Sequence, residues 1–145
     1  MSFDGKVALV AGGTGGLGRA ITAAFLAAGA RVVVTYRQQA EFDTVLLEAG
    51  ERAEALEGHV LDATDQEAAR AFVEQLASRL GRLDILVNAV GGYEGGTRLW
   101  ELDSGVLDKM LDLNLRSGFV MARAAIPVIP RPGGSSMFSP DTTPR

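Results

Sequence analysis

Short apolar runs alternate with helical patterns along this chain of 145 residues, and the alternation limits the fold more than any other feature. The runs occupy residues 6–11, 31–35, 53–61 and 83–90, the third being the weakest. They are too short for long helices and resemble the continuous apolar strands that parallel sheets bury on both faces. Strand and helix repeated in this order predict an α/β fold, a doubly wound parallel sheet with helices on both faces.

Four helical patterns separate and follow these runs. The first ends at Gly29, the second covers residues 40–49, and the last spans residues 104–126. The apolar face of the first pattern is predicted to contain Ile21, Ala24, Phe25 and Ala28. The third opens with a capping box formed by Thr64 and Glu67. Its buried stripe is predicted to contain Ala69, Phe72, Val73, Leu76 and Leu80.

The composition excludes several classes of function. Apolar residues make up 47% of the chain and charged residues 22%, as in folded globular proteins. A net charge of −4 without a basic stripe argues against a nucleic acid partner. The chain has no cysteine and a single histidine, His59, so neither a thiolate nor a histidine metal site is expected. No signal peptide or membrane-length apolar segment is visible, and we expect a cytoplasmic protein without a membrane partner.

The loop after the first apolar run has the pattern of a phosphate-binding turn. Gly12, Gly16 and Gly18, with Thr14 and Leu17 between them, follow a predicted strand and open a predicted helix. Glycines in this context let the backbone approach a pyrophosphate and direct helix amides at its charge. A flexible turn is the alternative, and the absence of a Gly-Lys-Ser/Thr sequence excludes a Walker A loop.

The loop after the second run bears on the type of dinucleotide. An NAD site usually has an acidic residue here, but this chain has Tyr36 and Arg37, and the next carboxylate along the chain is Glu41. A guanidinium can pair with a 2′-phosphate, and a tyrosine can lie against adenine. These residues predict an NADP site and make NAD less favoured; the alternative is that Arg37 is a solvated charge.

The ordered motifs resemble the N-terminal half of the short-chain dehydrogenase/reductase family. Ala11 to Gly18 is similar to its Thr-Gly-x-x-x-Gly-x-Gly motif, with Ala11 in place of threonine. The resemblance implies a Rossmann-type fold and assigns cofactor contacts, or support of the cofactor loop, to Asp62, Ala63, Asn88, Ala89 and Gly91. It also implies that Asn114 is the catalytic asparagine at a helix kink. From the residues alone, Asp62 could instead lead into the helix beside Thr64, and Asn114 could face solvent.

The resemblance further implies hydride transfer between a nicotinamide and a small carbonyl or alcohol. The family uses a serine, a tyrosine and a lysine four residues after the tyrosine. This chain contains two tyrosines, Tyr36 and Tyr93, and two lysines, Lys6 and Lys109, so it has no Tyr-x-x-x-Lys sequence. Three hypotheses remain: the cofactor half of an NADP-dependent reductase resembling an acyl-carrier-protein ketoreductase and inactive alone, a non-catalytic dinucleotide-binding or regulatory fragment, and a truncated or frame-shifted product.

The end of the chain differs in composition from the rest. All five prolines lie from Pro127 onward, and we expect a dinucleotide-binding domain at residues 1–130 and a disordered tail at residues 131–145. Residues 133–139 occupy the place of the family's fifth strand, which the resemblance packs against the first and fourth strands. Without that strand one sheet edge would stay open. The family resemblance also allows a homo-oligomer through helices near Asn114.

Overall fold

Four parallel strands form the centre of the protein, as the alternating sequence predicts. The computed structural model describes residues 1–131, and residues 132–145 are outside the description. The strands are β1 (Val7–Ala11), β2 (Arg31–Tyr36), β3 (Leu56–Val60) and β4 (Ile85–Asn88). They are ordered β3-β2-β1-β4, and each neighbouring pair is parallel.

The register brings the ends of three strands to the same level. Ala11, the last residue of β1, is opposite Thr35 in β2 and opposite Asn88 in β4. All five residues of β1 are buried, as expected for a strand with neighbours on both sides. The loops that follow β1, β2 and β4 therefore leave the sheet side by side, at the carboxyl edge where such sheets bind ligands.

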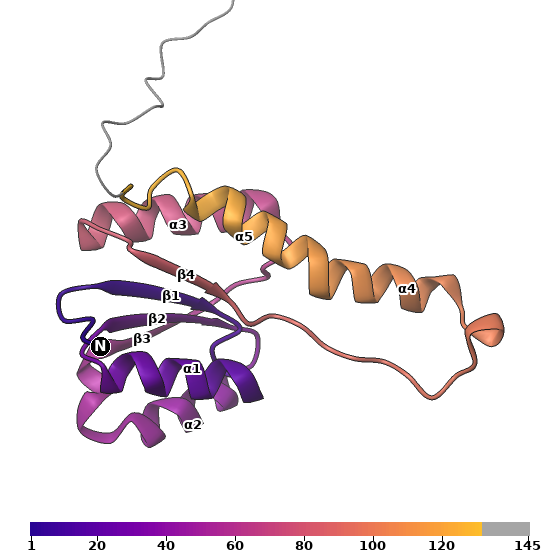
Figure 1. Ribbon diagram of the computed structural model, residues 1–145, viewed down its shortest axis with the longest axis horizontal. Coiled ribbons are helices and arrows are strands. Elements are labelled where there is room, and N and C mark those ends of the chain that lie inside the picture. Colours follow the sequence, from indigo (N-terminus) through magenta and orange to yellow (C-terminus); the bar gives the residue numbers. More distant parts are fainter. Residues whose placement is uncertain (132–145) are drawn as a thin grey trace, which may run out of the picture.

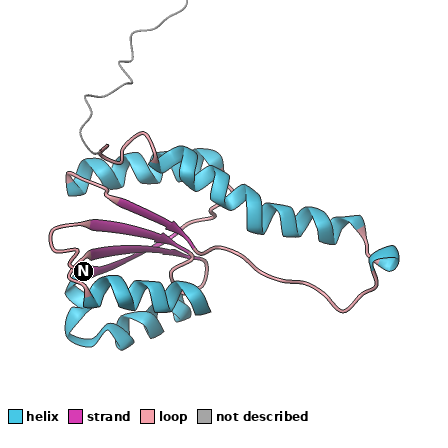
Figure 2. Cartoon of the chain, in the orientation of Figure 1, coloured by secondary structure: helices cyan, strands magenta, loops and turns pink. Residues whose placement is uncertain are grey.

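Two layers of helices cover the sheet (Figures 1 and 2). α1 (Gly16–Ala27) and α2 (Gln39–Ala49) lie on one face, and α3 (Gln66–Leu80) and α5 (Ser117–Ala125) on the other. Each face has its own apolar core, in which side chains of the sheet pack against those of the helices. The predicted stripe of α3 is confirmed, since Ala69, Val73 and Leu76 are buried and Phe72 and Leu80 pack beside them.

The predicted face of α1 is confirmed in part. Ile21 and Phe25 pack against the core, but Ala24 is exposed. The buried residues of the helix are Gly18, Thr22 and Leu26. Thr22 is fully buried because its hydroxyl donates a hydrogen bond to the carbonyl oxygen of Gly13, 3.4 Å away. A pattern based on apolar residues alone does not include Thr22, because it does not expect a polar residue to be buried. A threonine can be buried when its hydroxyl is hydrogen-bonded within the fold, so the predicted centre of the buried face is one position away from the observed one.

The start of α3 also differs from the prediction. The N-cap is Asp65, whose carboxylate accepts a hydrogen bond from the backbone N–H of Ala68 at 3.0 Å. The predicted capping box with Thr64 is therefore wrong. The Thr64 hydroxyl instead donates to Asp62, and the aspartate next to it is an equally good capping residue.

The last predicted helix is divided by a wider turn. α4 (Ser104–Leu111) is followed by a π-helical turn, Asp112–Arg116, and then by α5. Short 3-10 turns lie at Gly50–Ala55 and Leu99–Glu101. α4 buries no residue and extends beyond the sheet, together with the segment that joins it to β4 (Figure 1). Asn114 is the central residue of the π turn, which agrees with a helix kink at this position.

The sheet order corrects one expectation about the fifth strand. β1 is already paired with β2 and β4, so a fifth strand cannot pack beside it. Among residues 1–131, β3 and β4 each have one paired side. Residues 133–139, the candidate fifth strand, and the predicted tail after Arg131 lie outside the described residues. No helix in the described part is long and apolar enough to cross a membrane.

Candidate functional site

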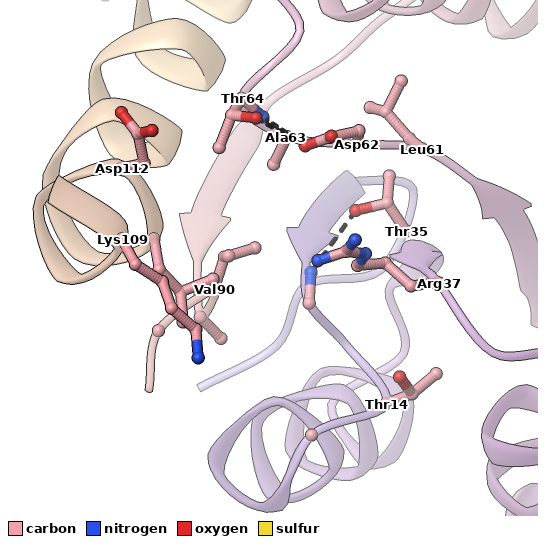
Figure 3. A pocket seen from close by; sticks show the side chains of 15 residues that line it. Thr14, Thr35, Arg37, Leu61, Asp62, Ala63, Thr64, Val90, Lys109 and Asp112 are labelled. Atoms are coloured by element: carbon pink, nitrogen blue, oxygen red, sulfur yellow. Dashed lines mark hydrogen bonds between the residues drawn. The ribbon is translucent and has the colours of Figure 1, made fainter. Parts of the chain in front are cut away.

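A cavity of about 590 Å³ opens at the carboxyl ends of the strands. Loops after all four strands contribute to its wall, and so does the junction between α4 and the π turn. In Figure 3, Lys109, Asp112 and Val90 lie on one side of the opening, and Arg37, Thr35 and Thr14 on the other. Of the predicted site residues, the cavity is lined by Gly12, Thr14, Arg37, Asp62, Ala63, Ala89 and Gly91.

The glycine loop is held tightly against the end of β2. Gly12 has a φ of 72°, which favours glycine, and its N–H donates to the carbonyl oxygen of Thr35 at 3.1 Å. A β-carbon on Gly18 would lie 2.0 Å from the carbonyl oxygen of Gly12, so only glycine lets the helix approach the loop. The sequence needs both glycines because two backbone segments meet here.

The beginning of α1 is suited to an anion. Its N-cap is Gly15, its first residue is Gly16, and no acidic side chain lies in its first turn. The first amides of a helix have no partner within it and carry the positive end of the helix dipole. Gly16 has open space where a β-carbon would be, and Leu17 is 70% exposed, so neither side of this turn is closed. A phosphate group can approach these amides directly.

Two neighbouring residues at the end of β2, Tyr36 and Arg37, were predicted to bind adenosine, and their side chains point in different directions. Arg37 and Thr35 line the cavity. The Tyr36 side chain is only 7% exposed, its ring stacks on Phe42 at 5.0 Å, and its hydroxyl donates to Gln39 at 2.6 Å. The predicted contact of Tyr36 with adenine does not agree with this position, because alternate residues of a strand point to opposite faces and Tyr36 points into the core.

Asp62 forms a compact turn with the residue two positions later. Its carboxylate accepts hydrogen bonds from the Thr64 hydroxyl at 2.7 Å and from the Thr64 N–H at 2.9 Å. These bonds, with a smaller contribution from the charge of Arg37, hold the pKa of Asp62 below its ordinary value. Asp62 therefore remains an anionic hydrogen-bond acceptor in the cavity wall, beside the buried Ala63.

Asn88 stands behind the cavity rather than in its wall. Its amide nitrogen donates to the Ser117 hydroxyl at 3.3 Å, which joins the end of β4 to α5. Its amide oxygen is buried and has no hydrogen-bond partner among the described residues. The following Ala89 donates its N–H to Ala11 at 2.8 Å, and Ala89 and Gly91 reach the cavity. Asn88 thus supports the segment that reaches the cavity.

Asn114 connects the π turn to the segment after β4. Its amide oxygen accepts from the N–H of Gly92 at 3.0 Å, and its amide nitrogen donates to the Gly92 carbonyl at 3.0 Å and the Met110 carbonyl at 2.9 Å. Asn114 is exposed, as the solvent-facing alternative predicts, but both ends of its side-chain amide are hydrogen-bonded within the protein. In this structure Asn114 acts by positioning Gly92 next to the cavity-lining Gly91.

Several wall residues were not found from the sequence. They are Gly15, Thr35, Leu61, Thr64, Val90, Lys109, Asp112 and Leu113. Lys109 pairs with Glu94 at 2.5 Å, which joins α4 to the segment after β4. Lys109, Asp112 and Leu113 have the spacing of one helix face, and this signal could have identified them once Asn114 was selected.

The wall residues fit a dinucleotide. The glycine loop gives a pyrophosphate access to the first amides of α1, Arg37 provides a cation, and Asp62 provides an acceptor for an amine. Among the described residues, the carboxylates that line the cavity are Asp62 and Asp112, and neither lies at the end of β2. The parallel sheet, the glycine loop and this cavity together define a Rossmann-type α/β protein of the dinucleotide-binding class.

Comparison with known proteins identifies the family. Residues 6–137 match the family model described as short chain dehydrogenase. The chain belongs to the short-chain dehydrogenase family, whose members are NAD(P)-binding oxidoreductases.

Two curated relatives illustrate the similarity. A cis-1,2-dihydrobenzene-1,2-diol dehydrogenase of Pseudomonas putida is 31% identical over 143 residues, which cover 96% of this chain and 51% of the relative. A monensin polyketide synthase ketoacyl reductase of Streptomyces virginiae is 39% identical over 123 residues, which cover 83% of this chain and 46% of the relative. The chain thus spans about half the length of these relatives.

Solved structures show the same fold. A short-chain dehydrogenase/reductase from Serratia marcescens superposes with a TM-score of 0.77 and 34% identity, over 89% of this chain and 53% of the other. An ElxO variant with NADPH bound gives a TM-score of 0.79 and 26% identity, over 83% of this chain and 49% of the other. The predicted Rossmann-type fold is confirmed.

Proposed function

We propose that residues 1–130 form the NADP-binding unit of a carbonyl or alcohol oxidoreductase. The observation that carries the proposal is the cavity wall itself, in which Arg37 follows β2 and no carboxylate ends that strand. An arginine there can pair with the 2′-phosphate that distinguishes NADP from NAD. The NADPH in the ElxO structure supports this choice by similarity of fold.

Each loop has a separate task in this proposal. The N-terminal amides of α1 hold the pyrophosphate, and Arg37 holds the 2′-phosphate. Asp62 accepts a hydrogen bond from the adenine amine, and Asn114 keeps the segment at Gly91 in place. When bound, the nicotinamide supplies or receives a hydride.

We further propose that the 145 residues bind the cofactor but do not turn over a carbonyl substrate alone. A proton donor is needed at the carbonyl oxygen, and a lysine normally adjusts the pKa of that donor. The sequence contains no Tyr-x-x-x-Lys, and Tyr36 is packed in the core. A ketoreductase is the reaction class that the relative from Streptomyces virginiae supports.

Titration of the full chain with NADPH and NADH, followed by nicotinamide fluorescence, tests the cofactor proposal. We expect saturable binding of NADPH and a loss of about tenfold in Arg37→Ala, because a charge-assisted hydrogen bond contributes about 1.5–3 kcal/mol and this one is exposed. Binding of NADH should change less than twofold. Arg52→Ala, in the 3-10 turn outside the cavity, is the matched control.

Two results would contradict the proposal. If neither dinucleotide saturates the protein, it has no dinucleotide site. If Arg37→Ala weakens NADPH and NADH equally, the arginine does not recognise the 2′-phosphate. Steady oxidation of NADPH with a panel of ketones would separately overturn the proposed inactivity.

A binding or regulatory role is the second candidate, favoured by the absence of Tyr-x-x-x-Lys from the 145 residues. It predicts the same titration and no turnover with any carbonyl.

A truncated or frame-shifted product is the third candidate. Sequencing the DNA beyond codon 127 in all three frames for a serine and Tyr-x-x-x-Lys distinguishes it from the second.

A homo-oligomer also belongs to the proposal. Leu107, Leu111, Leu115 and Phe119 are 47–66% exposed and recur every four residues along α4, the π turn and α5. Such a stripe is typical of an interface between helices. Light scattering of the full chain measures the assembly.

A further inference from the structure

Thr14 has an acidic partner that the family motif does not explain. It is 6% exposed and lines the cavity, and its hydroxyl donates a hydrogen bond to the carboxylate of Glu41 at 2.9 Å. Glu41 is exposed and lies in the first turn of α2. Both residues, with Gly15 and Gly16, also line a smaller neighbouring cavity of about 360 Å³.

The direction of this hydrogen bond decides what Thr14 can offer a ligand. A threonine hydroxyl has one proton and two lone pairs. Because its proton is given to Glu41, Thr14 presents lone pairs to the main cavity. A lone pair can accept a hydrogen bond from a ribose hydroxyl, but it repels the oxygens of a phosphate group.

The charge of Glu41 acts in the same direction. Arg37 is the cation on this side of the main cavity (Figure 3). Arg19, which lines the smaller cavity beside Glu41, is already paired with Glu48 of α2. The Glu41 carboxylate is one hydrogen bond away from the main cavity, because its partner Thr14 lines that cavity together with Arg37. A negative charge behind Thr14 opposes the binding of a phosphate that Arg37 would attract.

We propose that Glu41 is a cofactor-specificity residue, which opposes the 2′-phosphate of NADP and turns Thr14 into an acceptor for a ribose hydroxyl of NAD. The proposal rests on the proposed dinucleotide site and refines its selectivity. Arg37 and Glu41 act against each other, so the wild-type protein accepts both cofactors with a narrow preference for NADP.

Two substitutions separate the charge from the hydrogen bond. Glu41→Gln removes the charge and retains an oxygen that Thr14 can reach, whereas Glu41→Ala removes both and frees the Thr14 proton. Asp43→Asn is the matched control, since Asp43 is an exposed carboxylate on α2 that bonds to Gln39 and lines neither cavity. Each variant is titrated with NADPH and NADH as the full chain, with circular dichroism as the check on folding.

We expect NADPH to bind about threefold tighter to Glu41→Gln and up to about fivefold tighter to Glu41→Ala, the range for an exposed charge contact. NADH should be unchanged or up to about twofold weaker, and Asp43→Asn should match the wild type. An unchanged NADPH-to-NADH ratio in both Glu41 variants, or equal tightening of both cofactors, would overturn the inference while leaving the proposed function intact. A wild-type protein that binds neither dinucleotide would overturn the proposed function itself.

Discussion

The contact between Gly18 and Gly12 gives a sharp test of how the glycine loop is built. In Gly18→Ala, the new β-carbon would lie 2.0 Å from the carbonyl oxygen of Gly12 and 2.9 Å from the α-carbon of Gly13. Both atoms belong to the backbone, so no side-chain rotation can relieve the overlap. α1 must move away from the loop, and overpacking of this kind costs about 1–3 kcal/mol.

Alanine also has an intrinsic advantage in a helix, which partly offsets this cost. Gly to Ala favours a helix by about 1 kcal/mol. We therefore expect Gly18→Ala to lower the free energy of unfolding by up to about 2 kcal/mol. The affinity for NADPH should fall at least about tenfold, because displacement of the loop misaligns the helix amides with the pyrophosphate.

Gly16→Ala is the matched control, two positions earlier in the same helix. A β-carbon on Gly16 meets no atom within 4 Å, and its φ lies outside the left-handed region. We expect its free energy of unfolding to equal that of the wild type or to exceed it by up to about 1 kcal/mol. The comparison therefore isolates steric overlap from helix propensity.

Urea unfolding followed by far-ultraviolet circular dichroism measures the stabilities, and nicotinamide fluorescence measures the affinities. The reasoning is refuted if Gly18→Ala unfolds within about 0.5 kcal/mol of Gly16→Ala, the typical effect of a neutral surface change. Equal stability would mean that the loop can retreat from α1 without cost.

Two further predictions concern hydrogen-bonded side chains. Asn114→Ala should speed amide exchange at Gly92 and weaken NADPH binding about fivefold, while Asn114→Asp, which keeps the acceptor for the Gly92 N–H, should retain part of the protection; unchanged exchange at Gly92 in both variants would contradict this. At Glu57, burial raises the pKa, but hydrogen bonds from Arg79 and His59 outweigh it and lower the pKa from 4.5 to about 2. A lowered pKa in the folded state means that the ionised carboxylate stabilises the fold above its unfolded pKa. The free energy of unfolding of the wild type should therefore exceed that of Glu57→Gln by about 1 kcal/mol after screening by solvent. This difference should be complete above about pH 5 and decline as the pH falls towards about 2. A difference that stays constant between about pH 6 and pH 3 in urea unfolding would show that the ion pair contributes nothing.

The strands and the main loop were predictable because they depend on local chemistry. β1 and β2 are continuous apolar runs bounded by glycine or charge, and their burial on both faces follows from their place in the sheet. The fingerprint at Gly12 and Gly18 was predictable for the same reason, since close backbone approach leaves few alternatives to glycine. Arg37 reaches the cavity as predicted.

The errors arose where two neighbouring residues compete for one role. Thr64 and Asp65 can both cap a helix, and the structure uses Asp65 because Thr64 is bonded to Asp62. Tyr36 and Arg37 both follow an apolar run, and the alternation of the strand sends one to the core and the other to the cavity. Tertiary contacts make these choices, and a single sequence does not contain them in readable form.

In the proposed function, cofactor binding and hydride transfer depend on different groups of residues. The pyrophosphate, adenine and 2′-phosphate positions of the proposal depend on loops after β1, β2 and β3, and the segment after β4 is anchored by Asn114 and supported through Asn88. All of these contacts lie within the described residues, so the proposed affinity requires no group beyond Arg131. Hydride transfer also requires a proton donor held at the substrate oxygen. The family uses a tyrosine for this purpose, and no tyrosine lines the cavity among the described residues. Cofactor affinity and turnover should therefore respond to different parts of the polypeptide, and adding a segment with serine and Tyr-x-x-x-Lys should restore turnover with little change in the affinity for NADPH.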